Sequence, residues 1–574
     1  MTARNLSRLA VAALFAAWLA CAPAPPAPER ADLVLRGGVV ITVDPAIGEV
    51  QALAARGDRI LAVGSDAEIA RHIGDSTRVI ELAGRVVTPG FIEGHGHFSG
   101  IGEAMQVLDL MVVSNWDDVV AMVAAAAANA QPGEWILGRG WHQEKWNRAP
   151  EGAVEGFPVH HSISAVTPDN PVALTHASGH AAFFNARAMA LAGVDHETPD
   201  PAGGEILRDH RGAPTGVFSE TAASLVSRVR RSSELRRTPA ERAAAVRRAL
   251  RLADQECLSK GVTSFHDAGS TFGTIDTMRE MAAAGELRTR LWVMIRSSND
   301  QLRRDLPRYQ GLNVGPNRLV VRAIKRSIDG ALGSRGAWLL APYTDSPASS
   351  GLNTATVEDV EETARLAVEH GFQLCVHAIG DRANREVLDL FERAHPTRES
   401  LAQARWRVEH AQHLSAADIP RFAELGVIAS MQGVHCTSDA PFVVPRLGQA
   451  RAEEGAYVWR KLLDSGALVI NGTDAPVEDV NPLHSFHASV TRRTASGALF
   501  QPDQKMTRME ALQSYTAWAA RAAFEEHLKG TLTPGKLADL VVLTGNPLTV
   551  PDEGLEDLEV ALTVVGGEVV YQRR

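Results

Sequence analysis

Two histidines separated by a single glycine give the clearest local signal for chemistry in this sequence. They are His95 and His97, in the segment Pro89-Gly-Phe-Ile-Glu-Gly-His-Gly-His. Side chains along a strand alternate between two faces, so residues two apart point the same way and can hold one cation. Paired histidines also occur in cores and on surfaces. Taken alone, the pair is a weak prediction of a metal site.

Four more residues of suitable chemistry each stand at the end of an expected strand, just before a loop. They are Lys325, His377, His410 and Asp474. In a (β/α)₈ barrel the carboxyl ends of the strands meet at one mouth, where active sites lie. Structural interpretations stay open: a salt bridge for the lysine, core packing for the histidines and a helix N-cap for the aspartate. Together with the histidine pair, these residues favour one metal-binding constellation.

The elements that would position these residues alternate between apolar strands and helical stretches, which is typical of a parallel sheet. We expect eight barrel strands, at residues 91–95, 262–266, 291–295, 319–325, 373–377, 405–410, 426–432 and 467–472. The first two are far apart, so residues 102–252 are expected to hold an insertion and the first barrel helices. One helix there has a clear start, with Thr238 as N-cap and Glu241 completing a capping box.

Both ends of the chain are β-rich and punctuated by glycine. We therefore expect residues 32–88 and 530–574 to form one small β-rich domain, with the barrel and its insertion at residues 89–529. The fold class is thus predicted to be α/β, a TIM-type barrel with a small β-rich domain from both termini and an insertion after strand one.

The N-terminal segment resembles an export signal followed by a Pro-rich spacer, at residues 1–28. Arg4 and Arg8 precede an apolar run too short to span a bilayer, and Cys21 stands where a lipid-modified cysteine would. The expected location is the periplasm, or the bacterial envelope through a lipid on Cys21, which would be the sole membrane contact. A formal net charge of −10 argues against nucleic-acid binding. Three further cysteines are too few for a disulfide framework.

At this point the motifs resemble a known family. His-x-His after strand one, a lysine on strand four, histidines on five and six and an aspartate on eight resemble the amidohydrolase superfamily. Longer segments are similar to its amidohydrolase 3 (YtcJ-like) family, from about Asp32 to Val570. These segments are Lys325-Arg-Ser-Ile-Asp-Gly-Ala-Leu-Gly-Ser-Arg, His377-Ala-Ile-Gly-Asp-Arg-Ala, Glu409-His-Ala-Gln, Gly472-Thr-Asp-Ala-Pro and Pro534-Gly-Lys-Leu-Ala-Asp-Leu-Val-Val-Leu.

The resemblance implies a site with two divalent metal ions, for which zinc suits imidazole and carboxylate ligands. One ion would be bound by His95, His97 and Asp474, and the other by His377 and His410. Lys325 would bridge the two as a carbamate, since a free ammonium has no acceptor for a cation. Asp474 would also take the proton of an attacking water. The expected reaction is hydrolysis of a non-peptide C–N bond, such as an N-acyl or N-formyl amide, in a small molecule.

Softer candidates for substrate binding are the residues that match substrate-side motifs of the family or follow a barrel strand. They are His180, Trp141, His142, Arg335 and His435. Ser178 and His142 stand where the family pattern has acidic residues, and Gly433 stands where it has proline, so substrate preference is open. A structural role fits each of these five residues equally well.

Two enzyme alternatives keep the same site but change the bond: lactone or ester hydrolysis, or deamination of a ring. An alternative of another class is an exported lipoprotein that binds a metal or ligand without turnover. Asp474 in Gly-Thr-Asp speaks against that last alternative, because it supplies a group able to activate water. The sequence leaves the oligomeric state open.

Overall fold

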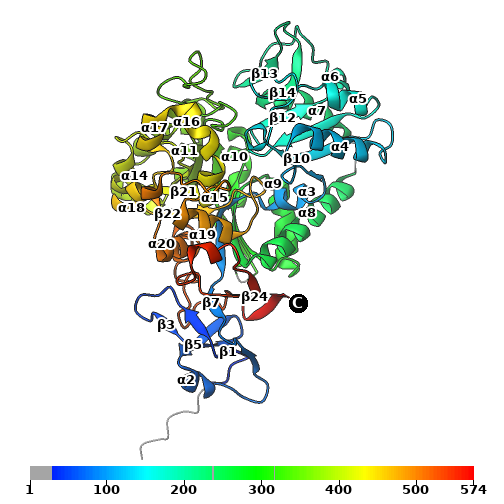
Figure 1. Ribbon diagram of the computed structural model, residues 1–574. Helices are drawn as coiled ribbons and strands as arrows, with labels where there is room; N and C mark the ends of the chain where they lie inside the picture. The colour runs from blue at the N-terminus through cyan, green and yellow to red at the C-terminus, as the bar shows by residue number, and fades with distance from the viewer. Residues whose placement is uncertain (1–28, 235–237, 316, 574) are drawn as a thin grey trace, which may run out of the picture.

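The largest sheet of the molecule is a parallel barrel. The computed structural model describes residues 29–234, 238–315 and 317–573 (Figure 1). Barrel strands follow one another in the order β8, β15, β16, β18, β19, β20, β21, β22. Their bounds are Phe91–Gly96, Val262–Ser270, Arg290–Ile295, Leu319–Ser327, Gln373–Ala378, Arg407–His410, Ile428–Gln432 and Val469–Gly472. The first and last strands come together where the Asp474 amide donates to the His95 carbonyl, at 2.8 Å. All eight expected strands are present, and the predicted barrel is confirmed.

Helices follow the barrel strands along the chain, as the alternating sequence pattern predicts. They are α3 (Phe98–Ala104), α8 (Pro239–Ser259), α9 (Phe272–Ala283), α10 (Asn299–Asp305), α11 (Val357–His370), α12 (Asp381–Ala394), α13 (Arg398–Ala404), α14 (Ile419–Leu425), α15 (Gly433–Ser438), α16 (Ala440–Leu447), α17 (Gln449–Gly455), α18 (Trp459–Asp464), α19 (Pro482–Thr491), α20 (Arg508–Ser514) and α21 (Ala517–Ala522). Helix α8 starts at the expected N-cap, where Thr238 and Glu241 form a capping box.

Strands from both ends of the chain share a sheet below the barrel. A six-stranded sheet has the order β25-β24-β23-β7-β2-β3, and a four-stranded sheet has the order β5-β4-β1-β6. Their bounds are β1 Leu33–Arg36, β2 Val39–Ile41, β3 Glu49–Val50, β4 Ala52–Arg56, β5 Arg59–Gly64, β6 Arg78–Glu81, β7 Val86–Pro89, β23 Leu540–Leu543, β24 Val560–Val565 and β25 Glu568–Gln572, with helix α2 at Asp66–Ala70. The blue and red segments accordingly meet at the bottom of Figure 1.

The long segment between α3 and α8 forms a sheet of its own, with the order β13-β14-β12-β11-β10-β9. Its strands are β9 (Leu108–Asp109), β10 (Ile136–Trp141), β11 (Val172–His176), β12 (Ala181–Phe184), β13 (Gly204–Arg208) and β14 (Pro214–Glu220), and its helices are α4 (Trp116–Ala127), α5 (His161–Val166), α6 (Ala186–Ala192) and α7 (Ala223–Glu234). We call this segment the insertion. It lies at the end of the barrel away from the small β-rich domain (Figure 1).

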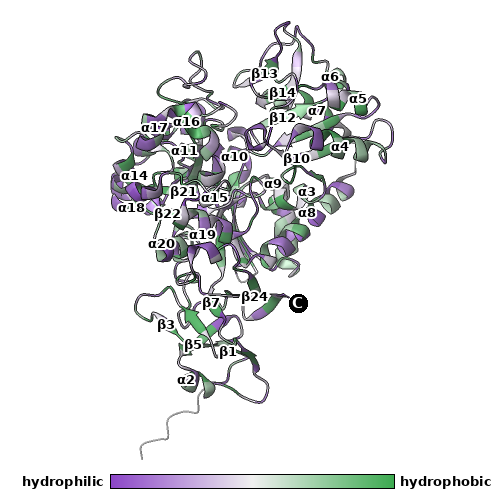
Figure 2. Ribbon diagram, in the orientation of Figure 1, coloured by the Kyte–Doolittle hydropathy of each residue, from purple (hydrophilic) through white to green (hydrophobic). Residues whose placement is uncertain are grey.

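Apolar side chains fill the barrel, the small domain and the insertion as separate clusters. In Figure 2, hydrophobic colouring follows the strands of the small domain, whereas hydrophilic colouring predominates on outer helices such as α18. Cys257, Cys375 and Cys436 are buried and unpaired, so packing rather than disulfides holds these parts together. Among the described residues, no helix is both long and apolar enough to span a bilayer. The expected export signal and Cys21 fall at residues 1–28, outside those residues.

Candidate metal centre

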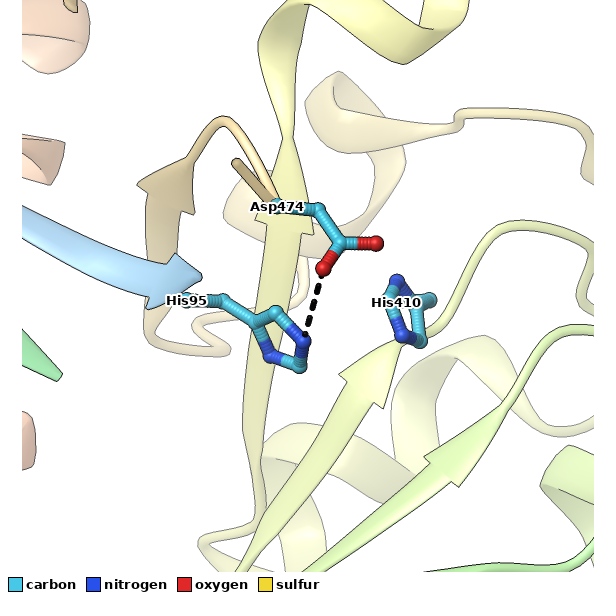
Figure 3. Close-up of side chains that lie close together, drawn as sticks. All are labelled: His95, His410 and Asp474. Atoms are coloured by element: carbon cyan, nitrogen blue, oxygen red, sulfur yellow. Dashed lines mark ion pairs between the residues drawn. The ribbon is translucent and has the colours of Figure 1, made fainter. Parts of the chain in front are cut away.

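Three predicted ligands converge at the barrel mouth, although they are distant in the sequence. Ligand atoms of His95, His410 and Asp474 all lie within 4.8 Å of one another, and the three side chains are buried (Figure 3). The Nε2 atom of His95 is 3.4 Å from Oδ1 of Asp474. Two imidazoles and a carboxylate at this spacing form a set that can bind a divalent transition metal.

The other predicted ligands surround this group of three. His97 places its Nε2 atom 3.2 Å from Asp474 Oδ1. The amine of Lys325 is 3.4 Å from Nε2 of His95. The rings of His377 and His410 lie with centroids 4.5 Å apart. The structure thus brings together all six residues that the sequence singled out, with His377 next to the central three.

The local backbone explains how these side chains reach one point. His95 and His97 share a face of the chain that leaves β8, and Gly96 between them is required, because a Cβ there would lie 2.6 Å from the Phe265 ring. His410 and Asp474 have φ angles of 77° and 57°. Left-handed backbone costs a residue with a Cβ about 1–3 kcal/mol, and such residues cluster at active sites. His410 is the last residue of β20, and Asp474 stands two residues after the end of β22.

Further polar groups orient the histidines, and the sequence analysis did not assign them this role. A carboxylate oxygen of Glu409 is hydrogen-bonded to Nδ1 of His95. Nδ1 of His410 is 2.8 Å from the Gln432 side-chain oxygen. Both contacts leave Nε2 of the ring for a ligand. Glu409 directly precedes His410 in the motif Glu409-His-Ala-Gln. Adjacent residues of a strand point to opposite faces, so the sequence did indicate that the side chain of Glu409 points to a different side from that of His410.

Asp329 lies beside His377 but differs from these groups, because its carboxylate is near Nε2 of the ring rather than Nδ1. One oxygen of its carboxylate is 3.4 Å from Nε2 of His377. The same carboxylate accepts backbone hydrogen bonds from Ile379 and Gly380, at 3.0 and 2.8 Å. Asp329 therefore ties the end of β19 to the loop that follows β18.

Burial and nearby charge set the protonation of the polar groups. Burial, with the charge of Arg296, lowers the pKa of Lys325 to about 8, against the opposing effect of Glu409. Burial alone would raise the pKa of Asp474, but the neighbouring rings of His95 and His97 hold it well below its usual range. An ionised carboxylate and an easily deprotonated amine therefore lie side by side at the mouth.

The mouth opens into a cavity of about 1240 Å³, whose wall comes from both the barrel and the insertion. Five of the six predicted ligands line it, namely His97, Lys325, His377, His410 and Asp474.

His180, one of the softer candidates, also lies on this wall. Its ring centroid is 4.9 Å from that of His377, and its Nδ1 atom is 3.0 Å from a carboxylate oxygen of Glu220. The insertion thus contributes an imidazole next to the candidate metal ligands.

Two other softer candidates of the insertion do not line the cavity. Trp141 is fully buried in the core of the insertion, where its indole N–H donates to the Leu174 carbonyl at 2.9 Å. His142 stacks on the Phe442 ring with centroids 5.5 Å apart. The structure gives both residues packing roles, because Trp141 ends β10 with its side chain turned into the sheet's own core.

Arg335 and His435 are likewise absent from the cavity wall. Arg335 pairs with Asp345, at 3.2 Å, instead of presenting its guanidinium to the cavity. His435 is buried, with Nδ1 3.1 Å from the Gln412 amide nitrogen. His435 lies in α15, directly after β21, and Arg335 lies in the segment after β18, but neither side chain lines the cavity.

Comparison with known proteins identifies the family. A family model described as "Amidohydrolase family" matches residues 78–571. The chain is 30% identical to a putative amidohydrolase, YtcJ, of Bacillus subtilis over 94% of this chain and 99% of that protein. It is 29% identical to an N-substituted formamide deformylase of Arthrobacter pascens over 95% of this chain and 99% of that protein.

A solved structure supports the same assignment. The crystal structure of an uncharacterized metal-dependent hydrolase from Pyrococcus furiosus matches 90% of this chain and 100% of its own, with a TM-score of 0.67 and 26% identity. The resemblance deduced from the motifs is therefore confirmed. The chain belongs to the amidohydrolase family and is an enzyme, a metal-dependent hydrolase of carbon–nitrogen bonds.

Proposed function

We propose that this enzyme hydrolyses an N-acyl or N-formyl amide of a small molecule, using water activated at the candidate metal centre. The observation that carries the proposal is the group of His95, His410 and Asp474 at the mouth of the cavity. Support for the bond type comes from the relative of Arthrobacter pascens, which is named as an N-substituted formamide deformylase and matches this chain almost end to end.

The residues present fit divalent metal ions. Nε2 of His377 and Oδ1 of Asp474 are buried, and neither makes a hydrogen bond of suitable geometry within the described residues. Their polar neighbours there are the Asp329 carboxylate, 3.4 Å from His377, and the rings of two other predicted ligands, 3.2 and 3.4 Å from Asp474. A bound cation would satisfy both atoms. We propose zinc, with His95, His97 and Asp474 holding one ion and His377 and His410 a second. Lys325, as a carbamate, would supply an oxygen to each. Such ions, when bound, lower the pKa of a coordinated water from about 15.7 toward 7 and polarise a carbonyl group.

The chain's own residues would move the proton. Asp474 is held ionised, so it can accept the proton of the attacking water as oxygen bonds to the carbonyl carbon. It then returns the proton to the nitrogen as the C–N bond breaks, which releases an amine and a carboxylic acid. His180 would orient the substrate, because Glu220 engages Nδ1 and leaves Nε2 on the cavity side.

Metal content and turnover together test this proposal. The chain, purified without added metal or chelator, is expected to carry about two transition-metal equivalents by elemental mass spectrometry. The zinc-loaded enzyme should hydrolyse N-formylphenethylamine faster than a lactone, an aryl ester or a ring amine such as adenine. No bound metal after reconstitution with zinc or manganese would refute the metal site, and preference for an ester or an adenine would refute the bond type.

We also propose that the enzyme is exported, on the basis of residues 1–28. The expected result is recovery from the periplasmic fraction, or from membranes if a lipid is attached to Cys21. A Cys21→Ala variant that stays with the membranes would contradict the lipid anchor, and recovery of the intact chain from the cytoplasm would contradict export.

A further inference from the structure

The cavity wall is rich in guanidinium groups, and they differ in how well they are paired. Arg326 forms an ion pair with Asp359, on the side away from the barrel axis. Arg139 donates to two backbone carbonyls, those of Pro476 and Ala177, each at 3.2 Å. The bond to Pro476 ties the insertion to the loop after β22. Arg296 differs from both, because it is exposed at the cavity and makes a single long hydrogen bond within the described residues.

The position of Arg296 is fixed by close packing of its aliphatic stem. The residue follows β16, and its amide donates to the Ser270 carbonyl at 2.9 Å. A Cβ on Gly269 would lie 3.0 Å from Cβ of Arg296 and 3.4 Å from Cγ of Lys325. The glycine, whose φ is +129°, therefore makes room for the arginine stem beside the lysine. Arg296 is held next to the candidate metal centre rather than at the outer rim.

The guanidinium of Arg296 has few partners in the described part of the chain. It makes one long hydrogen bond, 3.5 Å to the Ser327 hydroxyl, and forms no ion pair there. Burial of the group among protein atoms lowers the pKa of Arg296, and the charge of Asp474 offsets this only in part. A guanidinium has five N–H donors in a planar fork that matches a carboxylate. A cation so placed, beside a reacting centre, provides a binding site for an anion.

We infer that Arg296 binds a carboxylate carried by the substrate, so that the preferred substrates are N-formyl or short N-acyl derivatives of amino acids. This inference rests on the proposed function, since it names the substrate class of the same site. A formyl group carries no charged substituent, so the carboxylate must be on the amine part of the substrate. The cavity exceeds the roughly 300–1,000 Å³ of ordinary small-molecule pockets, which leaves space for an amino-acid side chain along the insertion.

The test compares two formamides that differ in one group. N-formylphenylalanine carries the carboxylate, and N-formylphenethylamine lacks it. The zinc-loaded full chain is expected to prefer the former in kcat/KM by about 10- to 100-fold, the range for a charge-assisted hydrogen bond. Arg296→Met should reduce this preference to within a few-fold of one, and Arg296→Lys should retain part of it.

Two further variants distinguish direct binding of the carboxylate by Arg296 from a general electrostatic effect of positive charge around the cavity. Arg248 also lines the cavity, and its guanidinium donates to Gln106 at 2.8 Å, so Arg248→Met removes the same charge from a different part of the wall. We expect this control to keep most of the preference. Gly269→Ala should reduce it, because the new methyl group displaces the arginine stem. Equal preference for the two formamides, or an equal effect of Arg248→Met and Arg296→Met, would overturn the inference.

A binding measurement separates this inference from the proposed function. If neither formamide is hydrolysed, the proposed reaction fails, but calorimetry with metal-free protein still tests the arginine. N-formylphenylalanine should then bind wild type at least about 10-fold more tightly than Arg296→Met. Equal affinities of the two proteins would reject carboxylate binding by Arg296, whatever the enzyme catalyses.

Discussion

Replacing Glu409 by glutamine should weaken zinc binding without unfolding the enzyme. The Glu409 carboxylate is completely buried, and one of its oxygens is bonded to Nδ1 of His95, whose Nε2 faces the candidate metal site. The charges of His95, Lys325 and Arg407 lower the pKa of Glu409, although burial opposes them. The ionised carboxylate fixes the ring orientation and makes the imidazole a better ligand.

The size of the effect follows from what glutamine keeps and loses. Its side-chain oxygen still accepts a hydrogen bond from Nδ1 of His95, but the negative charge is gone. Hydrogen bonds to charged groups contribute about 1.5–3 kcal/mol and neutral ones about 0.5–1.5, so the loss is about 1–1.5 kcal/mol. That corresponds to a roughly 10-fold weaker zinc affinity. Glu409→Ala, which also frees the ring, should reach the upper end of the 10- to 100-fold range seen for such partners of metal ligands.

Competition with a chromophoric chelator measures zinc affinity directly, and Glu93→Gln provides the matched control. Glu93 is also fully buried and lies on the same strand as His95, but it accepts hydrogen bonds from the backbone N–H of Thr473 and His95 and from the Thr473 hydroxyl. An amide can satisfy these partners. If Glu409→Gln binds zinc within two-fold of wild type, or if Glu93→Gln loses as much affinity, the assigned role of Glu409 is wrong.

Three other changes test two residues of the candidate metal centre and one ion pair of the fold. Asp474→Asn should lower kcat by about 10²–10⁴-fold while most zinc remains bound; kinetics beside metal analysis checks this, and undiminished turnover would exclude Asp474 as the base. Lys325→Ala should lose one of two zinc equivalents by elemental mass spectrometry, whereas unchanged stoichiometry would reject the carbamate bridge. Asp539→Ala should destabilise the fold by about 3–5 kcal/mol in urea unfolding, because it removes the carboxylate that lies 2.6 Å from the buried guanidinium of Arg290. Burial raises the pKa of Asp539, but the charge of Arg290 outweighs it and lowers the pKa below its ordinary value. This stabilisation is therefore present above about pH 4 and is lost as the pH falls through the lowered pKa. A difference in unfolding free energy between the two proteins that does not change with pH would contradict that linkage.

The barrel and the central residues were accessible from the sequence because both obey local rules. Each strand is a short apolar run, and each predicted ligand stands where such a run ends, so topology alone gathers them. His377 illustrates the limit of this reasoning. Its position at the mouth was predictable, but the carboxylate of Asp329 beside it, 3.4 Å away on the loop after β18, was not, because no motif links the two residues.

The insertion shows where sequence reasoning stops. Its sheet pairs strands in the order β13-β14-β12-β11-β10-β9 and mixes parallel with antiparallel neighbours. Strands this short leave no periodic pattern from which to deduce such pairing. Trp141 and His142 were judged by their resemblance to substrate-side motifs, yet Trp141 packs into the core of the insertion. Conversely, the sequence did not identify Arg296 as a candidate site residue. An arginine after a strand is usually interpreted as part of a salt bridge, and only the structure shows which groups surround it.

The chemistry and the selectivity of this enzyme therefore have different structural origins. The predicted metal ligands stand at the ends of barrel strands, and the barrel core, which changes little when a loop is altered, sets their positions. The far wall of the cavity is built from the insertion, with His180 near His377 and Arg139 anchored to the loop after β22. Changes in the insertion should thus alter which amide fits while the bond that breaks stays the same. Arg296 lies between the barrel-strand ends and the insertion, since it follows a barrel strand but is exposed at the cavity. This position suits a residue that aligns a charged substrate with the reacting centre.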